Sequence, residues 1–296
     1  MSSLIEQAAQ RLEQLRQAGA EMPASPVIQT VGATNPLNEI QSATLSRHVE
    51  IDLNVLAAAG IVNPYAPRSQ IADQFRVIKR PLIRNVMGKG ASPIAHGNLI
   101  MVTSALAGEG KTFTAINLAM SMATELDYTV MLVDADAPRP SVMKTLGLPE
   151  GPGLLDLVMG ESTDMSNVLL KTNIEKLTIL PIGTPHARAT ELLASEAMIQ
   201  LLDEMENRYP DRLIIFDSPP LLLTTEAPVL ASHMGQIVMV VQAGRTLQSE
   251  VRQALATIEA CPVKLMVLNQ ARTNFKGGYR YGEGGYGYGS DEQRRA

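Results

Sequence analysis

Six short apolar segments recur between residues 99 and 269, separated by stretches long enough for helices. Their sequences are LIMVT (99–103), VMLVD (130–134), LTILP (177–181), LIIFD (213–217), IVMVV (237–241) and LMVLN (265–269). Continuous apolar character is typical of strands that are buried on both faces of a parallel sheet. The alternation therefore predicts an α/β fold with a mostly parallel, doubly wound sheet and helices on both faces.

The residues before this alternation predict a separate extension. Residues 3–19 have the apolar spacing of an amphipathic helix, and 20–46 contain three prolines among small polar residues, as in a flexible linker. A short module at 45–65 precedes a charged helix at 68–85, which we expect to end or kink at Pro81. The predicted division is an N-terminal extension at 1–66, a nucleotide-binding domain at 67–275 and a flexible tail at 276–296.

Composition excludes several classes of protein. The net charge of −5 and a pI of about 5.5 give no electrostatic reason to expect nucleic acid as a partner. A single cysteine, Cys261, rules out a disulfide framework and paired-cysteine metal sites, and the four histidines show no ligand-like spacing. The polar N-terminus lacks the apolar core of a signal peptide, so we expect a cytoplasmic chain.

A phosphate-binding loop follows the first apolar segment, in TSALAGEGKT at 103–112. Gly108 and Gly110 allow backbone N–H groups to approach phosphate oxygens, and Lys111 reaches the β- and γ-phosphates. The Thr112 hydroxyl is a ligand for Mg²⁺ at the positive end of the helix that follows. The predicted nucleotide-contacting residues of this loop are Ala107, Gly108, Glu109, Gly110, Lys111, Thr112 and Phe113.

Three aspartates end two of the later apolar segments. Asp134 and Asp136 lie at the carboxyl end of one predicted strand, where side chains two residues apart point the same way. Asp217 ends another strand, as a carboxylate that holds Mg²⁺ or its water shell. Ligands of open α/β sheets bind at the carboxyl ends of the strands, so these aspartates are expected beside the phosphate loop.

Together these motifs resemble the bacterial tyrosine kinases of polysaccharide export, which are related to MinD/ParA-type ATPases. GEGKT, LVDAD and IIFDSPP are similar to the Walker A, A′ and B motifs of that family. The segment DQFRVIKRPLIRN (73–85) and the closing YGYG resemble the exosortase-associated tyrosine autokinases most closely. Leu106 stands where MinD/ParA proteins carry an additional lysine, which favours the kinase branch.

The resemblance implies a reaction and its residues. ATP and Mg²⁺ would bind at the loop, with Lys111, Asp134, Asp136 and Asp217 as catalytic residues and Thr112, Asp134 and Asp217 as metal ligands. We expect Asp136 to accept the proton of a tyrosine hydroxyl and Asp134 to lie nearer the metal. Asn269 resembles the adenine-contacting asparagine of the wider ATPase group, while Pro138 replaces the arginine that usually follows the second aspartate.

The tail, KGGYRYGEGGYGYGS, holds four of the chain's seven tyrosines among seven glycines. The resemblance makes Tyr279, Tyr281, Tyr286 and Tyr288 the expected phosphate acceptors. Because a glycine-rich chain is flexible, transfer between neighbouring subunits of an oligomer is the natural hypothesis. An altered form of the family's interface motif, Asp73, Arg76, Lys79 and Arg80, would supply part of the subunit contact, although a solvated charged helix explains these residues equally well.

The resemblance also implies partners and a location. The activator would be a separate membrane-embedded polysaccharide chain-length protein, which holds the kinase at the inner face of the plasma membrane, and a tyrosine phosphatase would reverse the reaction. Three alternatives stay open: a MinD/ParA-like ATPase that switches partners without phosphorylating tyrosine, a tail that serves only as an interaction module, and a tail that is a disordered leftover without a function.

Overall fold

The computed structural model describes residues 47–66, 69–88, 93–161, 164–208 and 211–271. The chain divides into two compact units, Met1–Ala43 and Thr44–Ala296, and the described residues all belong to the second. The predicted helix at 3–19, the linker at 20–46 and the tyrosine-rich tail lie outside the described residues.

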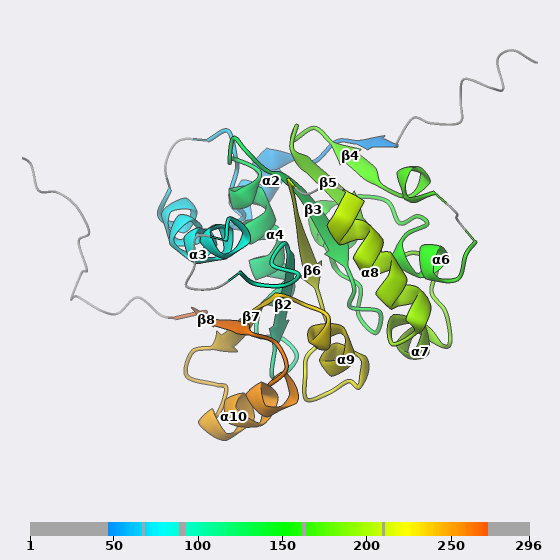
Figure 1. The fold of residues 1–296 in the computed structure, drawn as a ribbon. Coiled ribbons are helices and arrows are strands. Elements are labelled where there is room, and N and C mark those ends of the chain that lie inside the picture. The colour runs from blue at the N-terminus through cyan, green and yellow to red at the C-terminus, as the bar shows by residue number, and fades with distance from the viewer. Residues whose placement is uncertain (1–46, 67–68, 89–92, 162–163, 209–210, 272–296) are drawn as a thin grey trace, which may run out of the picture. The chain divides into compact units, whose positions relative to one another are not determined.

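An eight-stranded sheet forms the centre of this unit, in the order β1-β4-β5-β3-β6-β2-β7-β8 (Figure 1). The six strands from β5 to β8 in that order are parallel, whereas β4 is antiparallel to β5 and β1 pairs with β4 in parallel. The predicted α/β class with a mostly parallel sheet is confirmed. The strands are β1 (His48–Val49), β2 (Leu99–Ser104), β3 (Thr129–Asp134), β4 (Leu170–Thr172), β5 (Leu177–Leu180), β6 (Arg212–Asp217), β7 (Gln236–Gln242) and β8 (Val263–Asn269).

Helices cover both faces of the sheet (Figure 1). The helices are α2 (Leu53–Ala58), α3 (Gln70–Val86), α4 (Lys111–Met122), α5 (Val142–Leu146), α6 (Leu154–Val158), α7 (Ala189–Leu193), α8 (Glu196–Arg208), α9 (Glu226–Ser232) and α10 (Gln248–Thr257), with a 3-10 turn at Met165–Asn167.

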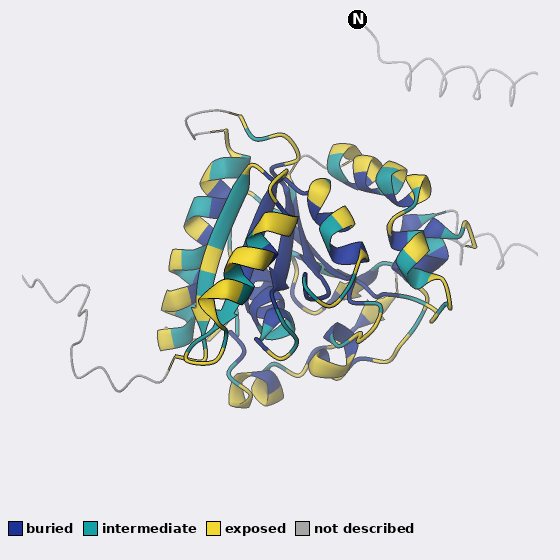
Figure 2. Ribbon diagram, turned by 90° about the horizontal axis from the view of Figure 1, so that it is seen from below, coloured by how far each residue is buried: buried dark blue, intermediate teal, exposed yellow. Residues whose placement is uncertain are grey.

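Alternation along the central strands builds two separate cores. In β2, Ile100 and Val102 join the core under α2, α3 and α4, whereas Leu99 and Met101 join the core under α6 to α9. Successive strand residues point to opposite faces, so a strand apolar at every position supplies both cores. Figure 2 shows the result, with buried strands inside helices that are buried on one side and exposed on the other.

The segment 47–66 packs into the first of these cores. Leu56 and Ile61 are buried there, and the backbone N–H of Val62 donates to Asn117 Oδ1 of α4 at 2.7 Å. The boundary predicted at residue 66 therefore falls within one packed unit.

Helix α3 continues past Pro81 to Val86, so it does not end at this proline, and the alternative expectation of a kink there stays a prediction. Proline removes one backbone donor from the helix. The turn that follows is nevertheless held by the burial of Leu82 and Ile83 and by a bond from Met87 N to the Ile83 carbonyl at 3.0 Å. Tertiary packing outweighs the lost hydrogen bond.

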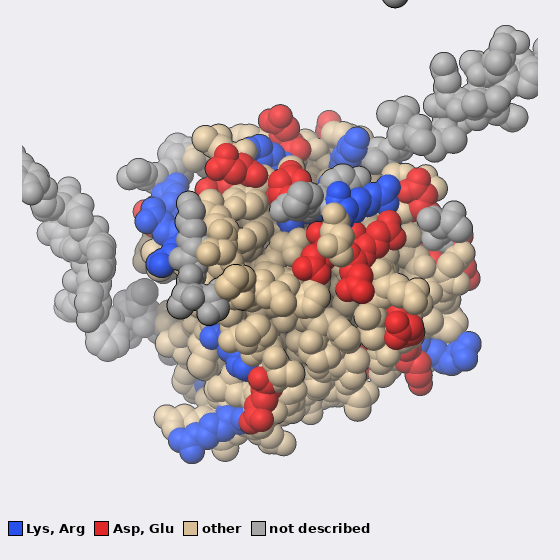
Figure 3. All heavy atoms as spheres, in the orientation of Figure 1, with Lys and Arg blue, Asp and Glu red and all other residues tan. Residues whose placement is uncertain are grey.

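Acidic side chains gather over α8 on the face drawn in Figure 3, with basic side chains beside them. Within the described part of the chain, no helix combines the length and apolar character that a membrane span requires.

Candidate active site

The phosphate loop leaves the carboxyl end of β2 and leads directly into α4. Gly108 and Gly110 adopt φ values of +83° and +96°, in the left-handed region that favours glycine. A Cβ at Gly110 would lie 2.1 Å from Asn269 Nδ2, so no side chain fits there. The loop therefore holds its backbone close to the end of β8, with the N-terminus of α4 facing the site.

Hydrogen bonds within the loop and from two other segments hold the loop closed. The buried carboxylate of Glu109 accepts the Leu106 N–H at 2.8 Å and the hydroxyl of Thr246, which follows β7. Asn269 Nδ2 donates to the Glu109 carbonyl at 2.9 Å. Glu109 thus shapes the loop from within instead of facing a ligand.

Thr112 and Asp217 meet directly at the start of α4. The Thr112 hydroxyl donates to Asp217 Oδ2 at 2.6 Å and lies 2.7 Å from the Ser141 hydroxyl. Asp217 is fully buried, and its other oxygen, Oδ1, accepts no hydrogen bond from the described residues. Burial, with the neighbouring charge of Asp134, raises the pKa of Asp217 well above its ordinary value.

The carboxylate of Asp134 accepts hydrogen bonds from the backbone that follows β3. Its Oδ2 accepts the N–H groups of Ser141 and Val142 at 3.1 and 3.0 Å, and its Oδ1 accepts that of Asp136 at 3.2 Å. Burial raises the pKa of Asp134 to about 6, although these bonds favour the charged form. Both oxygens are therefore engaged in shaping the turn.

Asp136 faces the phosphate loop instead. Its Oδ2 lies 3.8 Å from Lys111 Nζ, and both side chains are less than one-tenth exposed. Burial raises the pKa of Asp136, and the positive charge of Lys111 opposes that rise. The buried Glu226 of α9 adds a second negative charge nearby, which also raises the pKa of Asp136.

A cavity of about 490 Å³ opens over these groups. Its walls include the loop glycines, Lys111, Thr112 and Asp136, together with Arg139 and the segment after β6. Arg139 is exposed, and its charge favours the ionised form of Asp136. The cavity brings together phosphate-binding backbone, a cation and a carboxylate.

The described residues fit a bound Mg²⁺ ion. Mg²⁺ takes hard oxygen ligands, and the Thr112 hydroxyl and Asp217 carboxylate are adjacent oxygens of this kind. The unpaired Oδ1 of Asp217 is a buried polar atom that a metal or its water shell would satisfy. Asp134 contributes to this site as a neighbouring charge, and its predicted role as a direct ligand stays a prediction.

Comparison with known proteins is consistent with these motifs. Residues 97–268, more than half of the chain, match the family model described as an AAA domain. Tyrosine-protein kinase YwqD of Bacillus subtilis is 30% identical over 73% of this chain and 87% of its own length. The chain belongs to the bacterial tyrosine-protein kinases. The chain shares the P-loop nucleotide site of this family.

Two further comparisons show how much of the chain resembles known proteins. EpsB of Ralstonia nicotianae is 28% identical to this chain over 86% of the chain's length. The match spans about a third (32%) of the length of EpsB. The crystal structure of the chimerical protein CapA2B2 has 27% identity and a TM-score of 0.59, and the match covers 79% of the kinase and 98% of that chain.

Asn269 and Phe113 lie at the border of a second cavity, of about 520 Å³. Phe113 also lines the first cavity, and it packs edge to face with Phe75 of α3 at 6.5 Å between ring centroids. The Asn269 amide bonds to Glu109 and to Gln270 N within the kinase. Its predicted contact with adenine stays a prediction.

The predicted interface residues of α3 separate into two groups. Lys79 is buried, and its ammonium group contacts the Ser121 carbonyl at 2.5 Å and Glu125 at 2.6 Å. These contacts hold Lys79 within its own chain, and its assignment to an oligomer interface stays a prediction. Asp73, which pairs with Arg76, and Arg80 remain exposed or half-buried on the outer side. The four tail tyrosines lie outside the described residues.

Ser141, Glu226 and Thr246 contribute to the site and were not predicted from the sequence. Each of the three lies in a loop or at the start of a helix. Each is far along the chain from the site residue to which it bonds or whose pKa it raises. Ser141 follows two prolines, a pattern that indicates only a turn. No local signal connects any of the three with the phosphate loop.

Proposed function

We propose that the chain transfers the γ-phosphoryl group of ATP to the four tail tyrosines, between subunits of an oligomer, and so regulates exopolysaccharide production. The observation that carries this proposal is the position of Asp136, whose carboxylate faces Lys111 at 3.8 Å inside the cavity over the phosphate loop. A nucleotide-binding switch needs the loop and Asp217, whereas phosphoryl transfer to a hydroxyl also benefits from a group that accepts the proton.

Binding and orientation of the nucleotide would fall to the loop backbone and Lys111. The N–H groups around Gly108 and Gly110 and the N-terminus of α4 supply partial positive charge, and Lys111 adds a full one. Such preorganised charge stabilises the negative charge that spreads over the transferred group. Thr112 and Asp217 would hold Mg²⁺, which would supply positive charge to neutralise the phosphates when it is bound.

Asp136 is the better candidate for the proton acceptor. Asp134 uses both oxygens on backbone N–H groups, whereas Asp136 Oδ2 is directed toward the cavity and Lys111. A tyrosine hydroxyl has an ordinary pKa of about 10, so it needs a base or late proton loss at neutral pH. Burial raises the pKa of Asp136 and makes it a stronger base than an exposed aspartate.

The acceptors, the oligomer and the partners belong to the same proposal. The glycine-rich spacing of Tyr279, Tyr281, Tyr286 and Tyr288 suits a segment that enters a neighbour's site and leaves it again. Exposed charges of α3 would contribute to the subunit contact. The likeness to the chimerical CapA2B2 supports a second, membrane-embedded chain as activator, which would keep the kinase at the inner face of the plasma membrane, with a phosphatase to reverse the reaction.

The proposal also includes membership of the exosortase-associated branch of these kinases. It rests on the segment at 73–85 and the closing YGYG.

Incorporation of phosphate from γ-labelled ATP tests the proposed function. The full chain should label in the presence of Mg²⁺ and its activator, and Lys111→Met should abolish labelling because the loop loses its cation. A variant with all four tail tyrosines changed to phenylalanine is the matched control: it should still hydrolyse ATP but take up little label. ATP turnover with no phosphotyrosine in the unaltered chain would indicate a partner-switching ATPase instead.

A further inference from the structure

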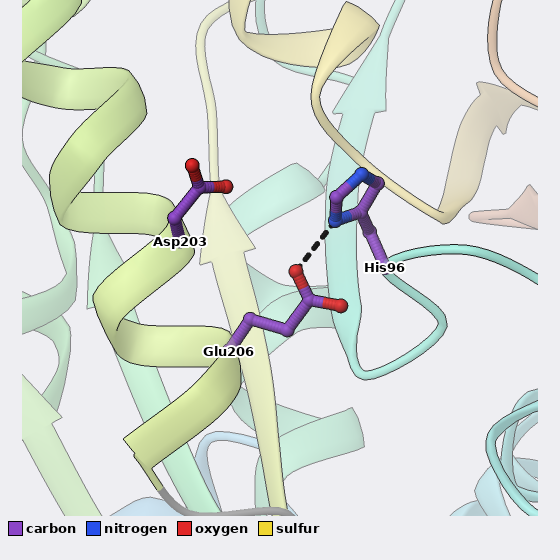
Figure 4. A group of neighbouring side chains, drawn as sticks. All are labelled: His96, Asp203 and Glu206. Atoms are coloured by element: carbon purple, nitrogen blue, oxygen red, sulfur yellow. Dashed lines mark hydrogen bonds and ion pairs between the residues drawn. The ribbon is translucent and has the colours of Figure 1, made fainter.

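A histidine and two carboxylates from distant parts of the chain converge at the amino end of β2. His96 precedes that strand, and Asp203 and Glu206 lie on α8 (Figure 4). One ligand atom from each residue lies within 4.8 Å of the other two. We propose that these three side chains hold a divalent metal ion of the Zn²⁺ class, at a site separate from the phosphate loop.

Both segments that carry the cluster, α8 and the turn before β2, have a defined local structure. Asp203 and Glu206 are three residues apart in α8, a spacing that places both on one face of a helix. The carbonyl of His96 accepts the Leu99 N–H at 2.9 Å, which closes the turn into β2. A Cβ at Gly235 would lie 2.2 Å from that same carbonyl, so the chain before β7 packs tightly against the histidine backbone.

The donor atoms favour Zn²⁺ over Mg²⁺ or Ca²⁺. Zn²⁺ binds imidazole nitrogen and carboxylate oxygen at about 2.0–2.2 Å, so the ligand atoms of a tetrahedral site lie about 3.4 Å apart. The three ligand atoms here all lie within 4.8 Å of one another, and side-chain rotations would bring them to the spacing that the ion requires. Mg²⁺ and Ca²⁺ prefer oxygen alone, whereas imidazole suits zinc and the later transition metals.

A simple hydrogen bond explains only part of this arrangement. His96 Nδ1 lies 2.5 Å from Glu206 Oε2, which accounts for those two side chains without a metal. Asp203 then adds a second negative charge beside Glu206, and no described residue forms a salt bridge with its carboxylate. A bound cation would satisfy both carboxylates at once.

The site has room for a solvent ligand. A cavity of about 340 Å³ adjoins it, lined in part by His96, Asn98, Glu206 and Asn207. The His96 side chain is 46% exposed, so an ion can enter from solvent. Three protein ligands with a water in the fourth position would complete a tetrahedral zinc site.

A metal here would stabilise the fold and take no part in phosphoryl transfer. It would tie α8 to the turn before β2, while the phosphate loop leaves the opposite end of that strand, six residues or about 20 Å away. The site is thus independent of the proposed kinase function. Loss of one would leave the other unaffected.

Zinc titration of the full chain tests this site. Metal is first removed with a chelator, and Mg²⁺ and ADP are then added to occupy the carboxylates at the phosphate loop. Competition for Zn²⁺ against a chromophoric chelator should reveal one Zn²⁺ per chain, and Zn²⁺ should raise the melting temperature. Mg²⁺ alone should produce no such rise.

Matched variants assign the binding to these residues. Asp203→Asn should weaken Zn²⁺ binding about tenfold or more and leave the hydrogen bond between His96 and Glu206 in place, so the variant should still fold. His96→Asn should also weaken Zn²⁺ binding and still fold, because asparagine tolerates the positive φ of 55° at this position. The controls are Glu204→Gln, which removes a charge from the same helix but from a pair with Arg208, and His48→Gln, which removes an exposed imidazole elsewhere.

Co²⁺ offers a spectroscopic readout of the same site. Visible absorption bands of a nitrogen- and oxygen-ligated Co²⁺ ion should form in the unaltered chain and in both controls, and disappear in Asp203→Asn and His96→Asn. Absence of Zn²⁺ binding, or equal Zn²⁺ affinity in Asp203→Asn and the two controls, would overturn the proposal.

Discussion

Gly110 leaves no space for a side chain between the phosphate loop and β8. Its φ of +96° already favours glycine, and the Asn269 amide occupies the position of a Cβ at 2.1 Å. The loop therefore depends on this glycine for two reasons, backbone conformation and close approach.

Gly110→Ala should abolish nucleotide binding, because the added methyl group displaces Asn269 and breaks its bond to the loop. Isothermal titration with ADP and Mg²⁺ measures the effect. The matched control is Gly147→Ala, where φ is +69° but nothing lies within 4 Å of an added Cβ. That change should cost about 1–2 kcal/mol of unfolding free energy from backbone strain and preserve ADP binding. Equal loss of binding in both variants would contradict this account.

Asp134 should make the nucleotide-free chain less stable as pH rises from about 4 to about 6. Burial raises its pKa from 3.8 to about 6, so in this range the folded chain holds a proton that the unfolded chain has released. The stabilisation is complete below about pH 4 and is lost as pH rises through about 6, a difference of about 3 kcal/mol. Urea unfolding at several pH values measures it.

Asp134→Asn should flatten this pH dependence, since asparagine does not titrate. Asp127→Asn, a change at an exposed aspartate, should leave the slope as it is. An unchanged slope in Asp134→Asn would assign the pH dependence to other buried acids, Asp217 first among them.

The site residues that could be predicted from sequence are those whose chemistry is local. The phosphate loop is a contiguous motif, and the aspartates follow recognisable strands. The direction of each aspartate could not be predicted, because it depends on which backbone N–H groups the following turn presents. Likewise, the sequence could not connect His96 with Asp203 and Glu206, because they lie more than a hundred residues away along the chain.

At the scale of elements, the six long strands were predicted because each is apolar at nearly every position. The short strands β1 and β4, which lie next to each other at one side of the sheet, were missed: they contain two and three residues and carry no pattern of their own. Helix α3 was predicted to end or kink at Pro81. Its continuation to Val86 depends on contacts with the core, and these cannot be predicted from the neighbouring residues in the sequence.

Lys79 fastens α3 to α4, so Lys79→Met should lower the free energy of unfolding by about 1–3 kcal/mol. Methionine keeps an apolar stem but loses the bonds to Ser121, Thr124 and Glu125. Chemical denaturation measures the change. Arg76→Met is the control on the same helix, because its ion pair with Asp73 is exposed and should contribute less than about 1 kcal/mol. Similar costs for both variants would contradict the anchoring role of Lys79.

At the scale of the whole described unit, the nucleotide site and the proposed metal site lie at opposite ends of the sheet's strands. Its carboxyl-end loops carry the phosphate loop, Asp136 and Asp217, and its amino end carries the proposed metal cluster. The parallel arrangement makes this separation predictable for the nucleotide site. The proposed transfer between chains would depend on contacts between subunits, so it requires a measurement on the assembled protein.

Mass spectrometry of tail peptides from a mixture of two variants tests the central claim most directly. One partner is Lys111→Met with an intact tail, and the other is an isotope-labelled active chain that lacks residues 276–296; both are incubated with Mg-ATP and the activator. The account predicts phosphate on Tyr279, Tyr281, Tyr286 or Tyr288 of the inactive chain, and none when either partner is incubated alone. Consumption of ATP by the mixture with no phosphate on those tyrosines would contradict it, provided that the unaltered chain consumes ATP under the same conditions.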